Sequence, residues 1–169
     1  MRSGVSNLVA AGLLLAGCQL SFVSRYDATT DKGVTALQRA IGRHLTALDA
    51  LAAEPPTLES LTESCRPAKF TATYRKLQGD LHTLIVRNEA REKNALTVRQ
   101  LEGLRDSLGT LQKLQQERYE PTDPARRIVQ PGDRCLSAGL VEAGRQSLDQ
   151  HIRAILKLEL AKRDFRKGE

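Results

Sequence analysis

Cysteine is the residue of this chain that is best suited to chemistry. The chain has three, Cys18, Cys65 and Cys135. Cys18 directly follows Leu15-Ala16-Gly17, at the end of a short apolar run that begins near Leu8 and comes after one basic residue, Arg2. A basic start, a brief apolar run and small residues before a cleavage point are typical of an export signal. The run falls short of the roughly 20 apolar residues that a membrane-spanning helix needs.

The sequence Leu15-Ala16-Gly17-Cys18 resembles the lipobox of bacterial lipoproteins. In that family the cysteine carries diacylglycerol and an N-acyl chain and becomes the first residue of the mature protein. The resemblance implies a signal peptide over residues 1–17 and lipidation at Cys18. Because Gln19 and not Asp follows, it also implies sorting to the outer membrane, facing the periplasm. An ordinary secretory signal is the alternative.

Acylation of Cys18 leaves Cys65 and Cys135 as the remaining pair of thiols. Compartments outside the cytoplasmic membrane are oxidising, so we expect these two cysteines to form one disulfide. Two free buried thiols are the alternative. Residues 18–26 would be a lipidated tether, whose residues 19–26 reach at most about 28 Å. Residues 27–169 would be one folded domain.

The composition favours helices over a sheet. Leu and Ala dominate the apolar positions, and Lys, Arg, Glu and Gln occupy the polar positions. Aromatic residues make up only 4% of the chain. Apolar residues recur at three- and four-residue spacing in four segments, which predicts four amphipathic helices. We expect a first helix from Asp27 or Thr30 to about Ala53 and a second that begins near Pro67. A third restarts near Asn94 and a fourth spans about 134–166.

Helices of this kind most simply form an up-down-up-down four-helix bundle, because none can bury its apolar stripe alone. The polar run from Arg87 to Asn94 decides the topology. If it breaks the helix, Cys65 and Cys135 lie at the same end of the bundle and can pair. If residues 67–119 form one continuous helix of about 80 Å, the two cysteines lie at opposite ends and cannot pair.

No catalytic or metal site is expected from the pattern. His44, His82 and His151 fall near the middle of three different helices, and none follows a Glu at the spacing that bundle metal sites use. There is no haem-attachment motif, and no cofactor is expected. Ser137 is more readily explained as a first-turn residue than as a nucleophile. We therefore expect no enzyme activity, and the chain lacks the signatures of nucleic-acid binding.

Two surfaces are candidates for partners. The bundle topology places seven basic residues near the membrane, where they could contact anionic lipid, although they could also be an ordinary solvated helix end. These residues are Arg87, Arg91, Lys93, Lys162, Arg163, Arg166 and Lys167. At the opposite end, the long loop from Tyr119 to Arg134 carries Arg126, Arg127 and Ile128, which could contact an envelope protein or be a tolerated surface loop.

Three further segments resemble a group of small Gram-negative lipoproteins. They are residues 24–38, Arg87-Asn88-Glu89-Ala90-Arg91, and residues 154–162. The resemblance covers nearly the whole mature chain and implies no activity or functional residue. Members of that group often have proline near the position of Glu92, which favours a helix break there. This chain has Glu, so the continuous helix stays open.

The formal net charge of +6 falls by one when Arg2 is removed with the signal peptide, and this modest excess suits anionic headgroups, glycan phosphates or acidic proteins. We expect a lipid-anchored interaction or structural component of the cell envelope. The alternatives are a bundle that binds a small ligand or metal, and a binder of anionic glycan or lipid through its basic ends.

Overall fold

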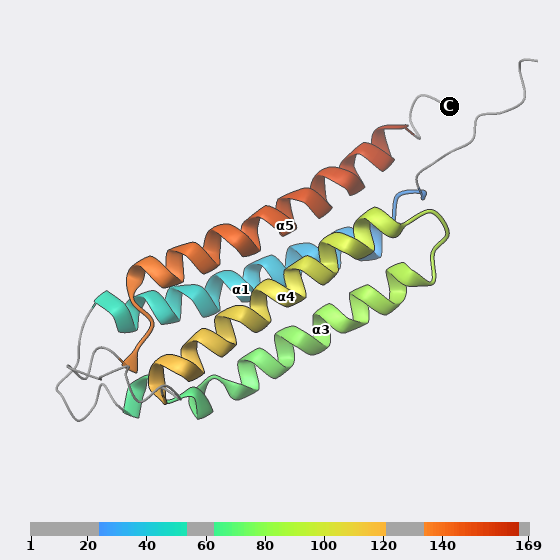
Figure 1. Ribbon diagram of the computed structural model, residues 1–169. Coiled ribbons are helices and arrows are strands. Elements are labelled where there is room, and N and C mark those ends of the chain that lie inside the picture. Colours follow the sequence, from blue (N-terminus) through green and yellow to red (C-terminus); the bar gives the residue numbers. More distant parts are fainter. Residues whose placement is uncertain (1–23, 54–62, 121–133, 166–169) are drawn as a thin grey trace, which may run out of the picture.

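The computed structural model describes residues 24–53, 63–120 and 134–165. They form four helices: α1 (Ala28–Ala53), α3 (Thr71–Glu89), α4 (Ala95–Tyr119) and α5 (Ala138–Phe165). A short 3₁₀ helix, η1 (Pro67–Lys69), leads into α3. Each helix runs antiparallel to the one before it, and α1 and α4 each pack against both α3 and α5 (Figure 1). The predicted all-α, up-down-up-down four-helix bundle is confirmed.

The apolar stripes meet in one continuous core. In α1 the buried apolar stripe is Val34, Leu37, Ile41, Leu45 and Leu48, and Leu51 at its end is half-buried. The spacing of three and four residues keeps these side chains on one face, as a helix of 3.6 residues per turn requires. The other helices contribute mainly leucine and isoleucine, which are close-packed along the bundle axis.

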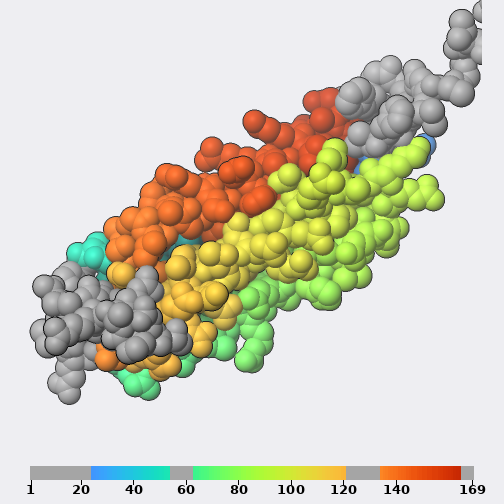
Figure 2. Space-filling model, viewed as in Figure 1, coloured from blue at the N-terminus to red at the C-terminus, as the bar shows by residue number. Residues whose placement is uncertain are grey.

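The α4–α5 pair packs with its side chains in contact along both helices (Figure 2). Gly103 allows one close approach, because a Cβ at this position would lie 2.4 Å from the ring of His151. The Nδ1 atom of His151 is 2.9 Å from Oε1 of Gln100, which holds the ring over the glycine. His151 is therefore a packing residue between two helices.

The polar run between the second and third predicted helices does break the helix. α3 ends at Glu89, α4 begins at Ala95, and Lys93 adopts a left-handed conformation with φ of 57°. The continuous 67–119 helix is wrong. No Gly or Pro is needed, because the carbonyl of Lys93 accepts a hydrogen bond of 3.0 Å from the backbone N–H of Ser24. The left-handed residue is therefore held by the N-terminal segment.

Two expected helix starts differ in detail. Asp27 caps α1 as predicted, since its Oδ1 accepts the backbone N–H of Thr29 at 3.1 Å. α4 begins directly after Asn94, whose side chain makes no capping bond and points inward. α5 begins at Ala138 and not near 134, where the chain instead passes Cys135 toward its partner cysteine.

The two ends of the bundle have different compositions. We call the end formed by residues 24–30, 86–97 and 159–165 the N-terminal pole; these segments lie together in Figure 1. We call the end formed by residues 63–70, Tyr119 and residues 134–137 the disulfide pole. None of the described helices is both long and apolar enough to span a membrane.

Candidate functional site

Buried polar side chains gather at the N-terminal pole. Ten polar or charged residues of the described chain are buried, and all but His44 and Gln115 lie there. The eight at the pole, which we call the polar network, are Ser24, Asp27, Thr30, Asn88, Asn94, Thr97, Glu159 and Lys162. They come from the N-terminal segment and from all four helices. Buried polar groups are costly unless they are hydrogen-bonded, so their pairing decides what this pole does.

An ion pair between Lys162 and Glu159 lies at the centre of the polar network. The two side chains are 3% and 1% exposed. The Lys162 ammonium also donates to Asn94 Oδ1 at 2.7 Å and to Thr97 Oγ1 at 2.9 Å, so all three of its N–H groups have acceptors. The second oxygen of Glu159, Oε2, accepts the backbone N–H of Asp27 at 3.1 Å. A buried pair is tolerable only with such additional bonds.

Two asparagines extend the polar network from α4 to α1. Oδ1 of Asn94 accepts the Ser24 hydroxyl at 2.7 Å, and its amide donates to Asn88 Oδ1 at 2.6 Å. The amide of Asn88 donates to Thr30 Oγ1 at 3.0 Å and to the Leu84 carbonyl at 2.7 Å. Thr30 in turn donates to Asp27 at 2.8 Å. A continuous chain of hydrogen bonds therefore connects the N-terminal segment to three helices.

Asp27 closes the polar network toward solvent. Its carboxylate accepts two bonds from the guanidinium of Arg87, at 2.9 and 3.1 Å, in the bidentate geometry that arginine and carboxylate favour. The hydrogen bond from Arg87 is the main reason that the pKa of Asp27 lies well below its ordinary value, and the bonds from Thr30 and Thr29 act the same way. The carboxylate therefore stabilises the fold above pH 3.8, and this contribution is lost as the pH falls through the lowered pKa.

Only some members of the predicted basic cluster are exposed on the surface. Lys162 was expected to face the membrane, but its ammonium is buried in the polar network, because Glu159 and Asn94 supply its acceptors. Arg87 is bound to Asp27, and Arg91 donates to the carbonyl of Arg25 at 2.7 Å. Lys93 and Arg163 are exposed at the pole as expected, and Arg166 and Lys167 lie outside the described residues.

The expected tether is bound to the bundle from Ser24 onward. The backbone N–H and the hydroxyl of Ser24 both have partners in the α3–α4 turn, and the carbonyl of Arg25 binds Arg91. Cys18 and residues 19–23 lie outside the described residues. Ser24 is six positions after Cys18, and six steps of about 3.5 Å each span at most about 21 Å. Any group on Cys18 therefore stays near the N-terminal pole.

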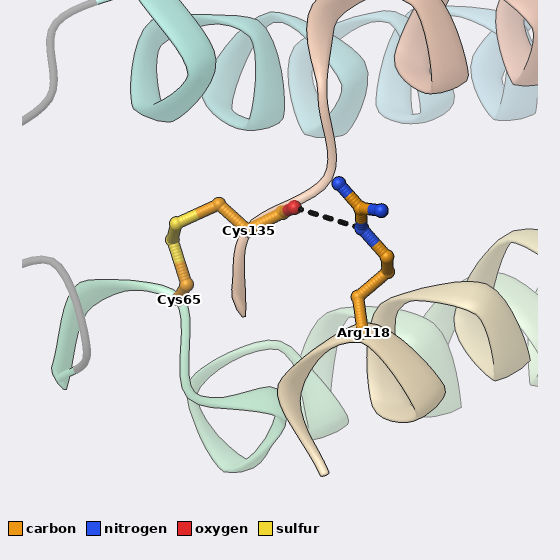
Figure 3. The surroundings of a disulfide bond; sticks show 3 residues. All are labelled: Cys65, Arg118 and Cys135. Atoms are coloured by element: carbon orange, nitrogen blue, oxygen red, sulfur yellow. Dashed lines mark hydrogen bonds between the residues drawn. A yellow bond between two sulfur atoms is a disulfide. The ribbon is translucent and has the colours of Figure 1, made fainter. Parts of the chain in front are cut away.

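A disulfide joins Cys65 and Cys135 at the opposite end, as predicted. Their Cα atoms are 5.3 Å apart and 70 residues apart in sequence. The carbonyl of Cys135 accepts a bond of 3.4 Å from Nε of Arg118, so the end of α4 is tied to the same point (Figure 3). Tyr119 and Leu51 pack against the two cysteines. The partner-loop candidates Arg126, Arg127 and Ile128 lie outside the described residues.

The three histidines do not converge. His44 is buried edge-on against Tyr74, with ring centroids 4.6 Å apart, and burial lowers the pKa of its imidazole. His82 is exposed on α3, and His151 packs on Gly103. Across the described ranges, no group of three or more His, Cys, Asp or Glu side chains is placed to hold a metal ion. His44 therefore acts in the core as a neutral ring.

The sequence contains one feature that indicates the polar network and that the sequence analysis did not use. Asn88 continues the buried stripe of Leu81 and Leu84, and Glu159 continues the stripe of Ile152 and Ile155. A polar residue at a core-facing helix position disturbs the apolar pattern unless its side chain has a role in the interior. Ser24, Thr97 and Asn88 were not singled out, because short polar residues are usually at the surface.

Comparison with protein-family models, with curated proteins and with solved structures gives no significant match to this chain. The function therefore has to be argued from the two poles themselves.

Proposed function

We propose that this protein is a bacterial lipoprotein, held in the outer membrane by acyl chains on Cys18, and that it acts in the periplasm as a structural or interaction component of the cell envelope. The observation that carries the proposal is the attachment of residues 24–27 to the polar network. A cysteine six residues before Ser24 would be held beside one pole of a rigid bundle, and the other pole would be presented about 40 Å away, the length of α5 at 1.5 Å per residue.

Two further features support this proposal. The Cys65–Cys135 disulfide suits a compartment outside the cytoplasm, where such bonds persist. The bundle axis is filled by fully buried side chains such as Leu81, Leu101, Leu108 and Ile152, so the described core is built for rigidity and not for holding a ligand. Rigid spacing between a membrane and a partner is a function that such a body supports.

The anchor is tested by metabolic labelling with a radioactive fatty acid in a Gram-negative host. We expect label in the full chain, cleavage after Gly17, and recovery of the protein in the outer-membrane fraction. Cys18→Ser should lose the label and the cleavage. The matched control is the double variant Cys65→Ser/Cys135→Ser, which loses the two other cysteines, keeps Cys18 and should keep the label. An unlabelled wild-type chain recovered in the soluble periplasmic fraction would overturn the proposal.

The interaction role is tested in the same cells with a photo-crosslinking amino acid at Lys69, an exposed position of the disulfide pole, and at Gln38, an exposed position midway along α1. We expect one discrete adduct from position 69 that is absent from position 38. Equal, diffuse adducts at both positions would contradict a partner at the disulfide pole.

A further inference from the structure

Large apolar side chains that remain exposed share one location. Among the residues whose burial the structure describes, they are Val86, Leu96 and Leu160, with exposed fractions of 49%, 53% and 41%. Single exposed apolar residues are ordinary on protein surfaces. Here all three lie at the N-terminal pole, and none lies along the rest of the bundle.

The three residues all lie close to the helix ends at this pole, but on three different helices. Val86 lies three residues before the end of α3, Leu96 is the second residue of α4, and Leu160 lies five residues before the end of α5. At 1.5 Å per residue, each is within about 8 Å of its helix end. Because they belong to three helices of the bundle, no single stripe or groove contains them. A planar layer that covers the end of the bundle to a depth of about 8 Å would contact all three.

Charge does not select the occupant of this surface. Among the described residues, the exposed cations Arg25, Lys93 and Arg163 are matched by the exposed carboxylates Glu89, Glu92 and Asp164. Arg87 and Arg91 both lie within ion-pair distance of Asp27, and Lys162 is buried together with Glu159. The described part of this pole therefore carries little net charge, and the apolar side chains are its distinguishing feature.

The geometry points to a lipid bilayer as the occupant: Val86, Leu96 and Leu160 insert into its interfacial layer, and the bundle stands end-on. This inference rests on the proposed lipid anchor, since Ser24 begins at this pole and Cys18 can lie at most about 21 Å away. The depth also agrees, because apolar faces of interfacial proteins enter the headgroup and acyl boundary by roughly 5–10 Å. The polar network lies at the same level as the three apolar side chains and joins the four helices there.

The absence of tryptophan from the chain makes the contact measurable. Leu96→Trp places an indole on the second residue of α4, at the N-terminal pole. Ala72→Trp is the matched control, because Ala72 is the exposed second residue of α3 at the opposite pole. Each full-length variant is extracted with its anchor and reconstituted into phosphatidylcholine vesicles with or without brominated acyl chains, which quench nearby indoles.

We expect brominated lipid to reduce emission at position 96 by about twofold or more, with a blue shift, and to leave position 72 unchanged. Adding Val86→Glu and Leu160→Glu to Leu96→Trp should abolish most of the quenching, while the melting temperature stays near that of the parent because both side chains are exposed. Undiminished quenching in that variant would mean that the indole inserts alone, and would overturn the three-residue contact.

Flotation of the vesicles separates the two proposals. Protein that does not float with the vesicles overturns the lipid anchor and the end-on contact together. Protein that floats but is quenched at neither position, or equally at both, overturns the end-on contact and leaves the anchor standing.

Discussion

The two poles of the bundle are closed by opposite means. At the disulfide pole, one covalent bond joins Cys65 to Cys135, and apolar and aromatic side chains surround it. At the N-terminal pole, eight buried polar residues are joined only by hydrogen bonds and one ion pair. The covalent closure depends on redox conditions and little on its neighbours. The polar closure depends on every member, because each buried donor or acceptor that loses its partner keeps the cost of its burial.

The difference follows from what each pole has to hold. At the N-terminal pole an extended segment lies against helix ends, so its backbone groups need partners. The N–H of Ser24 finds the carbonyl of Lys93, and the N–H of Asp27 finds Glu159. A disulfide could tie this segment at one point but could not satisfy its amides. A buried carboxylate does both, and Lys162 compensates its charge.

The largest expected effect comes from unpairing the polar pole. Lys162→Met leaves the Glu159 carboxylate buried without a cation, and we expect a loss of about 3–5 kcal/mol in the free energy of unfolding. The double variant Lys162→Met/Glu159→Leu removes both charges and should recover much of that loss. Urea unfolding at pH 7 measures both. A single variant as stable as wild type would show that the ion pair contributes nothing.

Breaking the covalent pole should cost somewhat less. Cys65→Ser/Cys135→Ser releases a loop of 70 residues in the unfolded chain, and we expect a loss of about 2–4 kcal/mol. Adding a reductant should lower the stability of the wild type and of Lys162→Met alike, but not that of the double serine variant. Because the poles are far apart, the losses from the two poles should add when combined. Strong non-additivity would contradict the independence of the poles.

The smallest expected effect is a pH dependence from His44, which lies near the disulfide pole. Burial lowers the pKa of His44 in the folded protein from its ordinary 6.5, so below that pH the unfolded chain binds a proton that the folded chain does not. Stability should fall as the pH is lowered from 7.5 to 5.5, by at most about 1.4 kcal/mol from this group. His44→Phe should weaken the fall, and an unchanged pH profile in that variant would contradict the assignment.

The parts of the fold that depend on local residue spacing could be predicted from the sequence. The amphipathic helices follow from apolar spacing and the cysteine pairing from the oxidising compartment, whereas the polar run 87–94 is compatible with either a break or a continuous helix. The polar network could not be predicted in the same way. Lysine is almost never fully buried without a partner, so Lys162 was assigned to the surface, and its partners Asn94 and Thr97 are more than 60 residues away in sequence.

The predicted start of the last helix, near residue 134, is wrong for a different reason. Asp133 is a good capping residue, and the sequence from 134 onward has helical spacing. The chain instead begins the helix at Ala138, because Cys135 must reach Cys65 and Leu136 must enter the core before the helix direction is set. The disulfide and the burial of Leu136 therefore move the start of the helix by about one turn from the position that the local sequence favours.

The hydrogen bond between Asp27 and Glu159 also orders events in time. Its partners are 132 residues apart, so this bond cannot form until the last helix has been made, whereas Ser24 finds its partners earlier, in the α3–α4 turn. During synthesis, α1, α3 and α4 can approach one another earlier, but the amide of Asp27 must wait for residues 159–162. Contacts of such long sequence separation form late and slowly. The attachment of the N-terminal segment is therefore complete only after α5 has been made, and a chain that stops short of α5 lacks the bond from Asp27 to Glu159.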